Sequence, residues 1–281
     1  MFDKRVPKEY YEEMDGGRME ELFYDSRVYS GDQAAVRKRA LVYLPKGYEE
    51  NDRRYKVLYL MHGGGGDEEE IMYCQDRSLA LKHLLDHMIA NGDIEPLMVV
   101  TPTFYYADSD AALHDITEAV VLTKNFHYEF RNDLLPAVDG TYRTIPDREH
   151  RAFGGFSMGA EATWEMFLNS LDLIRNFMPL SGDCWIAAEK GGASFSGKTS
   201  RLMKAAIKER GFDGYSYNIF AFTGNEDIAF PAMDPMIKAM LADGFDDGED
   251  RRLRYGTWKE GIHTYHFGYE YIYNILPEIL R

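Results

Sequence analysis

A serine stands between small residues in the stretch RAFGGFSMGAEATWEMF, which begins at Arg151. Gly155 and Gly159 flank Ser157 in a Gly-x-Ser-x-Gly spacing, where an apolar run gives way to a helical pattern. A sharp strand-to-helix turn lifts such a hydroxyl above a sheet, and small neighbours permit the strained backbone that the turn requires. The spacing therefore predicts a nucleophile at Ser157, although a serine that merely caps the helix is the alternative. A serine hydroxyl is a weak nucleophile alone, so the chain must also supply a base, an acid and oxyanion donors.

Four glycines, Gly63–Gly66, follow His62 and an apolar run, and they form the candidate oxyanion loop. Backbone N–H groups in such a loop can approach a substrate oxygen closely, and acyl transfer needs donors of this kind. We select Gly64 as one donor and expect the second at Met158, directly after the nucleophile. Gly65 is a candidate substrate-binding residue, and His62 is expected to shape the loop. A loop without chemistry is one alternative; a phosphate loop is disfavoured because no Gly-Lys-Ser/Thr follows.

The acid and the base are expected after Ser157 in the order Ser, Asp, His. Asp227, in TGNEDIAF, comes two strands after the nucleophile and is favoured as the acid, with Asp183, in PLSGDCW, as a competitor. A solvated or capping carboxylate is the alternative for each. Two histidines follow the last predicted strand. His263 is favoured as the base because a glycine and a loop precede it, and His266 is expected to line the site.

Aromatic residues make up 14% of the chain, and several follow predicted strand ends. Each alone is more often a packing residue than a binding residue. Several near one serine indicate a flat, apolar acyl group or a sugar as ligand. Trp185 and Phe230 are the candidate substrate-binding aromatics, and others in similar positions are Tyr105, Tyr106, Tyr265 and Phe267.

Strand-like and helical patterns alternate along the chain, which predicts a mostly parallel sheet covered by helices on both faces. Ligands of such sheets bind beyond the carboxyl ends of the strands, where the candidate residues fall. We expect one domain over 1–281, with 1–30 as an N-terminal extension or edge segment. Strands are predicted at 37–45, 55–62, 96–103, 151–157, 176–182, 217–224 and 252–258, and helices at 77–92, 125–138, 160–170, 233–244 and 269–280, with Pro136 kinking or interrupting the second of these helices.

Net charge is −15 and the pI is about 5.0, which argues against nucleic-acid binding. No apolar run reaches the roughly 18 residues of a membrane span, and no signal-peptide pattern opens the chain. The expected location is therefore cytoplasmic, or extracellular if a leader has been removed. Cys74 and Cys184 form no motif, so two buried thiols are expected, with a disulfide as the alternative. His83 and His87 have a metal-ligand spacing but no third ligand, so no metal site is expected.

These motifs together resemble the feruloyl esterases of carbohydrate esterase family 1, near esterase D in the α/β-hydrolase superfamily. Segments that carry the resemblance include LYLMHGGGGDEEE, EPLMVVTPTF, GGFSMGAEATW, PLSGDCW, TGNEDIAF and GIHTYHFGYEYIYNILP, which span most of the chain. The resemblance implies an α/β-hydrolase fold and no cofactor. It also implies nucleophile, acid and base roles for Ser157, Asp227 and His263, oxyanion donors at Met158 and the glycine loop, and Trp185 in the substrate cleft. The stretch 105–124 is longer than expected and is interpreted as a lid or rim insertion.

The sequence thus predicts a serine esterase that releases ferulate or a related hydroxycinnamate from arabinoxylan through an acyl-enzyme. An acetyl-xylan esterase or general carboxylesterase is the nearest alternative. An acyltransferase and a non-catalytic carbohydrate-binding protein are more distant ones. Neither nucleic acid nor a membrane is expected as a partner, and the oligomeric state stays open.

Overall fold

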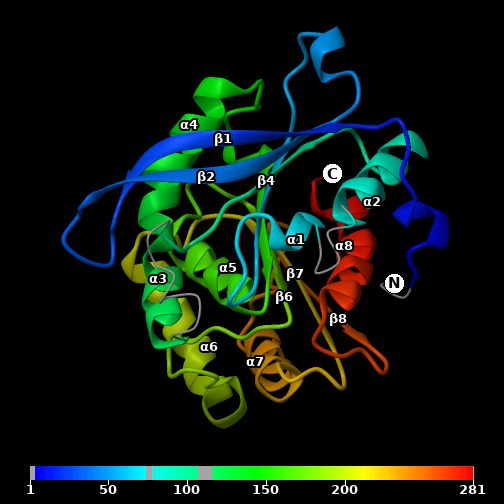
Figure 1. The fold of residues 1–281 in the computed structure, drawn as a ribbon. Coiled ribbons are helices and arrows are strands. Elements are labelled where there is room, and N and C mark those ends of the chain that lie inside the picture. The colour runs from blue at the N-terminus through cyan, green and yellow to red at the C-terminus, as the bar shows by residue number, and fades with distance from the viewer. Residues whose placement is uncertain (1–3, 74–77, 79, 107–115, 281) are drawn as a thin grey trace.

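The computed structural model describes residues 4–73, 78, 80–106 and 116–280. An eight-stranded sheet in the order β1-β2-β4-β3-β5-β6-β7-β8 runs through the molecule (Figure 1). β1 and β2 pair antiparallel, β2 meets β4 antiparallel, and the remaining neighbours are parallel. The strands are β1 (Arg18–Arg27), β2 (Ala35–Leu44), β3 (Val57–Met61), β4 (Met98–Thr101), β5 (Arg151–Phe156), β6 (Asn176–Leu180), β7 (Tyr217–Gly224) and β8 (Arg251–Trp258).

Helices cover both faces of this sheet (Figure 1). On one face lie α3 (Ile116–Glu129), α4 (Leu135–Thr141), α5 (Met158–Asn169), α6 (Gly192–Glu209) and α7 (Phe230–Ala242). On the other lie α1 (Glu70–Tyr73), α2 (Ala80–Ala90) and α8 (Tyr265–Ile279). The predicted fold, a mostly parallel sheet with helices on both faces, is confirmed.

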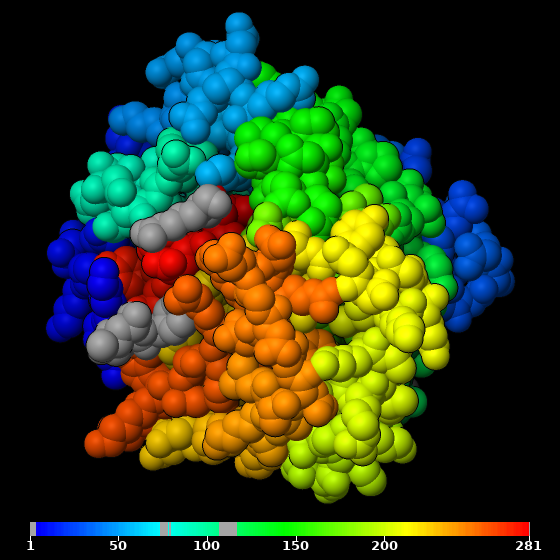
Figure 2. All heavy atoms as spheres, turned by 180° about the vertical axis from the view of Figure 1, so that it is seen from behind, coloured from blue at the N-terminus to red at the C-terminus, as the bar shows by residue number. Residues whose placement is uncertain are grey.

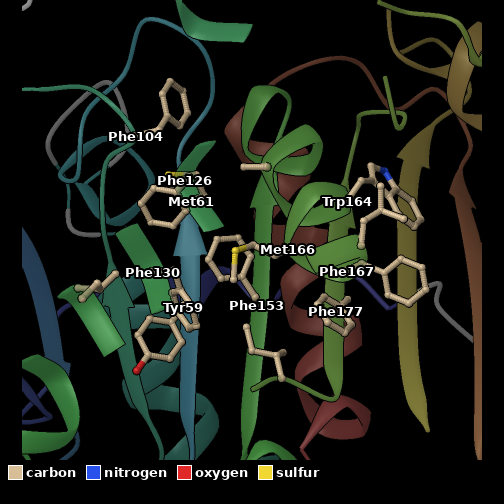
Figure 3. Packing of buried hydrophobic residues seen from close by; sticks show 14 of the residues in the cluster. Tyr59, Met61, Phe104, Phe126, Phe130, Phe153, Trp164, Met166, Phe167 and Phe177 are labelled. Carbon is tan, nitrogen blue, oxygen red and sulfur yellow. The ribbon is translucent and has the colours of Figure 1, made fainter. Parts of the chain in front are cut away.

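The central strands are hydrophobic throughout because helices pack on both of their faces. All residues of β3 and β5 are buried. Figure 3 shows the core on the α5 side, where Phe177 from β6 packs against Phe167 from α5, and Tyr59 and Phe153 from β3 and β5 pack against Phe130. Edge strand β1 instead alternates exposed and buried residues over its second half, the pattern of a strand with one covered face. Dense packing on both faces fixes the strand ends from which the candidate residues project.

The N-terminal segment lies against the C-terminal helix, as Figures 1 and 2 show. Asn274 of α8 accepts a hydrogen bond from the backbone N–H of Lys4 (3.0 Å) and donates one to its carbonyl (2.8 Å). Glu270 accepts from the N–H of Val6 (2.7 Å). Residues 4–30 therefore include both a segment docked on α8 and the edge strand β1.

The structure differs from the sequence predictions in several places. Helices α1 and α6 were not predicted, and β1 was not predicted as a strand. The helix expected from residue 125 begins at Ile116, and it passes into α4 through a π-helical segment, Phe130–Leu134, so Pro136 in the first turn of α4 does not end it. Of the expected lid at 105–124, residues 107–115 lie outside the described residues, and 116–124 belong to α3. Cys74 also lies outside them, and Cys184 is a buried free thiol.

Two neighbouring carboxyl groups on α5 differ in burial: Glu161 is buried and Glu165 is half-buried. Glu161 is 1% exposed, and neither of its carboxyl oxygens has a hydrogen-bond donor in the described parts of the chain. Burial, and then repulsion from Glu165, raises the pKa of Glu161 well above its usual range, and burial raises the pKa of Glu165 as well. A carboxyl whose pKa is raised by folding binds more protons in the folded state. The free energy of unfolding is therefore highest below the unfolded pKa of this carboxyl, near 4.5, where Glu161 is protonated in both states. It falls as the pH rises from there toward the folded pKa.

Glu161→Gln should accordingly raise the unfolding temperature at pH 8 and have less effect at pH 5. A neutral amide removes the penalty for ionising Glu161, and we expect a gain on the order of 1–2 kcal/mol at pH 8, with roughly 2–4 °C in unfolding temperature per kcal/mol. Scanning calorimetry at the two pH values checks this, with exposed Glu209→Gln as the control. A gain that is the same at both pH values would contradict the assignment.

Candidate active site

Ser157 lies in the turn between β5 and α5, with φ 58° and ψ −116°, a backbone conformation that is unusual for a residue with a side chain. The turn is closed by close backbone approaches on either side of the serine. A Cβ on Gly155 would lie 2.4 Å from the carbonyl oxygen of Gly159, and one on Gly159 would lie 2.4 Å from that of Met61. Only glycine fits at these two positions, which explains the Gly-x-Ser-x-Gly spacing. The turn places the hydroxyl at the carboxyl end of the sheet, beside the N-terminus of α5.

The structure brings Ser157, His263 and Asp227 together from three strand ends. His263 Nε2 lies 2.9 Å from Ser157 Oγ, and His263 Nδ1 lies 2.7 Å from Asp227 Oδ1. Asp227 is buried, and its Oδ1 also accepts the N–H of Ala229 at 2.8 Å. A carboxylate can only accept, so Nδ1–H donates to Asp227, and Nε2 is left to accept the proton of the serine hydroxyl.

Asp183, the competing acid, has a different position. It follows β6 and is buried, and its Oδ1 accepts the indole N–H of Trp185 at 2.9 Å. Its Oδ2 accepts the N–H of Gly192 at the start of α6, at 2.8 Å. Burial raises the pKa of Asp183 above its usual value, although these two donors oppose the rise. Asp183 thus fixes Trp185 and the start of α6, and no hydrogen bond joins it to His263.

Three of the four N–H groups of the glycine loop are already engaged, which singles out the fourth. Gly63 donates to the Tyr265 hydroxyl at 2.7 Å, Gly65 donates to the Tyr105 hydroxyl at 3.1 Å, and the N–H of residue 66 donates to Gly63 O at 3.4 Å. Gly64 N–H meets no acceptor within 4–73, 78, 80–106 and 116–280. Gly64 contacts Met158, whose own N–H opens α5 and has no intrahelical acceptor. These two N–H groups are therefore available to an oxyanion above Ser157.

His62 holds the glycine loop in place through a hydrogen bond to the Gly63 carbonyl. It is fully buried, with Nδ1 2.6 Å from the Gly63 carbonyl and Nε2 2.8 Å from the Thr103 hydroxyl. Burial lowers the pKa of His62 to about 4, so the ring is neutral at physiological pH. The carbonyl must accept, which places the ring hydrogen on Nδ1 and lets Nε2 accept from Thr103.

A cavity of about 460 Å³ opens beside Ser157. We call it the large cavity. Trp185, Met158, Gly64 and Gly65 line it as part of the predicted set, with Tyr105 from the end of β4. Phe230 does not: it is half-buried in the first turn of α7, while the preceding Ile228 and Ala229 line the cavity. Asp183, the competing acid, also lines the cavity, and further lining residues that the sequence did not indicate are Ala119, Ser181, Gly182, Lys190 and Ala232.

A second space of about 300 Å³, which we call the small hollow, lies on another side of Ser157. Ser157, His263 and Gly64 border both spaces. His266, predicted to line the site, lies here and not in the large cavity. The remaining lining residues are Gly63, Glu70, Phe156, Thr264 and Tyr265. Glu70 was not singled out from the sequence, since it lies in an acidic run, Asp67–Glu70, with no motif of its own.

The described residues contain neither a candidate metal site nor a candidate membrane-spanning helix. Among residues 4–73, 78, 80–106 and 116–280, no group of three or more His, Cys, Asp and Glu side chains could hold a metal ion. No helix in the same ranges is long and apolar enough to cross a bilayer. The arrangement of a hydroxyl, an imidazole, a buried carboxylate and two unpaired N–H groups can carry out acyl transfer through a covalent intermediate.

Comparison with known proteins gives a consistent result. A model of the Esterase family matches residues 36–189. The chain is 37% identical over 250 residues to endo-1,4-beta-xylanase Y of Acetivibrio thermocellus, covering 84% of this chain and 21% of that protein. It is 31% identical over 154 residues to an endo-1,4-beta-xylanase/feruloyl esterase of Xylanibacter ruminicola, covering 53% of this chain and 20% of that protein. The chain thus spans about a fifth of the length of these curated relatives.

Solved structures are similar over nearly the whole chain. One is a serine-to-alanine variant of the feruloyl esterase module from Clostridium thermocellum complexed with sinapinate, with 33% identity and a TM-score of 0.81 over 99% of this chain and 94% of that one. Another is a CE1 ferulic acid esterase from Anaeromyces mucronatus in complex with ferulic acid, with a TM-score of 0.70 over 98% and 96% of the two chains. At 17% identity, the second likeness shows the fold alone.

Proposed function

We propose that this chain, which belongs to the Esterase family and within it to the feruloyl esterases of carbohydrate esterase family 1, is a serine esterase that releases ferulate or a related hydroxycinnamate from arabinoxylan. The observation that carries the acyl class is the large cavity, about 460 Å³ beside Ser157. Trp185, Tyr105 and Ile228 give it aromatic and aliphatic walls. A planar aromatic acid can fill such a space, whereas an acetyl group would leave most of it empty.

The reaction follows from the hydrogen-bonded chain of three residues. His263 Nε2 accepts the proton of Ser157 as Oγ attacks the ester carbonyl, and Asp227 stabilises the resulting imidazolium. The N–H groups of Gly64 and Met158 donate to the oxyanion. His263 then protonates the leaving alcohol, which leaves ferulate esterified to Ser157. Water, activated by the same imidazole, attacks this acyl-enzyme and releases the acid.

Gly64→Ala should lower kcat on a feruloyl ester, because the new Cβ would lie 2.8 Å from Met158 Cγ, so that either the glycine loop or Met158, which carry the two oxyanion donors, has to shift. Complete loss of a donor costs about 10²- to 10³-fold in kcat, and we expect a loss that approaches this range. Steady-state kinetics on methyl ferulate measures it. Gly140→Ala is the matched control, since a Cβ there meets nothing within 4 Å. An unchanged kcat in Gly64→Ala would place the oxyanion donor elsewhere.

The proposed acyl class is tested by comparing ferulate release from feruloylated arabinoxylan oligosaccharides with acetate release from acetylated xylan. The large cavity predicts a much higher kcat/KM for the feruloyl substrate. A preference for acetylated xylan would favour the acetyl-xylan esterase alternative. Transfer of ferulate to an added sugar in place of water would favour the acyltransferase.

A further inference from the structure

The two spaces beside Ser157 differ in chemistry, although both border the same hydroxyl. Tyr105, Trp185 and Ile228 make the large cavity mainly apolar. The small hollow has polar side chains that reach it from two elements, Glu70 from α1 and Thr264 and His266 from the start of α8. An ester likewise has two unlike halves joined at the carbonyl that Ser157 attacks. If the aromatic acid occupies the large cavity, the alcohol half must leave on another side.

His263 borders both spaces, and once the aromatic acid fills the large cavity, the side of the imidazole that is left for the alcohol half is the small hollow. The imidazole must protonate the leaving oxygen, so this oxygen has to lie within reach of Nε2. His263 and the three residues that follow it, up to His266, all line the small hollow. The alcohol half therefore leaves the reaction centre beside these residues and next to the small hollow.

Glu70 is the charged acceptor in this hollow. Its side chain is half-buried, and no described residue donates a hydrogen bond to its carboxylate or forms an ion pair with it. Neighbouring acids differ in this respect, because Glu68 and Glu69 are both paired with Arg39. Burial, with repulsion from Asp67, raises the pKa of Glu70 above its usual value. A half-buried carboxylate that borders a hollow, with no donor among the described residues, can accept hydrogen bonds from a ligand bound there.

We propose that the small hollow binds the alcohol half of the ester, a sugar with neighbouring hydroxyl groups, and that Glu70 accepts hydrogen bonds from two of those hydroxyls. This inference rests on the proposed function. A carboxylate has two oxygens that accept and none that donate, which suits a pair of adjacent hydroxyls on an uncharged sugar. Thr264 and His266, across the hollow, supply further polar contacts. An alcohol half that carries a carboxylate would be repelled by Glu70, so the hollow favours neutral sugars over uronic acids.

The test compares two esters of the same acid, methyl ferulate and a feruloylated arabinoxylan oligosaccharide, in the wild type and in Glu70→Ala and Glu70→Gln. Methyl ferulate presents the acyl half without a sugar. We expect Glu70→Ala to lower the ratio of kcat/KM for the oligosaccharide to that for methyl ferulate by about 10- to 100-fold, the usual effect of removing a hydrogen-bonded charge. Glu70→Gln, which keeps one acceptor, should lower the ratio less.

Two further variants separate this effect from a general loss of activity. Glu69→Gln changes the adjacent carboxylate, which is paired with Arg39 at 2.8 Å, and should keep the ratio. Ile228→Ala alters the large cavity and should change kcat/KM for both esters by the same factor. A Glu70→Ala enzyme that keeps the wild-type ratio, or a Glu69→Gln enzyme that loses it, would overturn the assignment of Glu70.

Failure of the proposed function gives a different result. If the wild type hydrolysed neither feruloyl ester but cleaved acetyl esters, the acyl class would be wrong while the hollow could still be judged. The same ratio would then be measured with acetylated arabinose and methyl acetate, and a loss in Glu70→Ala would support the sugar site. If the wild type cleaved none of these esters, both proposals would fall.

Discussion

Ser157→Ala should lower kcat for ferulate release by about 10⁴- to 10⁶-fold, the largest effect expected of any substitution in this chain. The variant removes the only hydroxyl that lies 2.9 Å from His263 Nε2 in the described structure. His263 and the oxyanion donors stay in place, so a small residual hydrolysis by water should remain. Ferulate release from a feruloylated arabinoxylan oligosaccharide, followed by chromatography, measures the loss.

Ser170→Ala is the matched control for that variant. Ser170 terminates the same helix α5, is fully buried, and its hydroxyl has no hydrogen-bond partner in the described part of the chain. The control should keep its activity and its labelling by a fluorophosphonate, whereas Ser157→Ala should lose both. Equal ferulate release by wild type and Ser157→Ala would show that another residue is the nucleophile.

Seven of the eight strands were predictable, because each of them combines apolar residues with a clear break, whereas β1 was covered only by the expected N-terminal extension or edge segment. β3 and β5 are fully buried and end in glycine-rich turns, so both their position and the residues beyond them follow from the pattern. Helix α6 was missed for the opposite reason. It begins with GASFSGK, in which glycine and serine favour turns over helix, and its backbone is irregular at Phe195. Packing of α6 against α7 compensates for that weak local preference.

Some residues of the candidate site were likewise predictable from the sequence, and others were not. Ser157 and the glycine loop have motifs of their own, and the order of the chain suggested Asp227 and His263. Which glycine donates was a choice among four N–H groups, and it depends on the hydroxyls of Tyr105 and Tyr265, which arrive from distant parts of the chain. Phe230 was a wrong choice for the same reason. It starts α7 and is not among the residues that line the large cavity, whose wall is built by Ile228 and Ala229 just before it. The direction of side chains in a loop does not repeat at a fixed spacing, as it does in a helix or a strand, so the sequence pattern does not indicate which loop residues face the cavity.

Asp227 and Asp183 were both candidates for the acid that supports His263, and the structure gives them different hydrogen-bond partners. The second large effect is expected from a substitution of Asp227. Asp227→Asn should lower kcat by about 10⁴-fold, with little change in KM. Asp227 Oδ1 accepts from both His263 Nδ1 and Ala229 N–H, while Oδ2 is buried and has no partner among the described residues. An asparagine can present its oxygen to these two donors only by burying an unpaired NH₂ at the Oδ2 position. The other orientation aims NH₂ at His263 and forces the wrong tautomer. Either orientation removes the charge that stabilises the imidazolium.

Asp183→Asn is the comparison that makes this result specific, because Asp183 is equally buried and also follows a strand of the parallel sheet. Its oxygens accept from Trp185 and Gly192, so the amide can satisfy only one of these donors and should let the indole shift in the large cavity. We expect a loss of about tenfold, mainly through KM for feruloyl esters, since one neutral or charge-assisted hydrogen bond is involved. Steady-state kinetics on methyl ferulate separates kcat from KM for both variants. A 10⁴-fold loss of kcat in Asp183→Asn, with an active Asp227→Asn, would exchange the roles of the two acids. The expected pattern assigns catalysis to Asp227 and substrate positioning to Asp183.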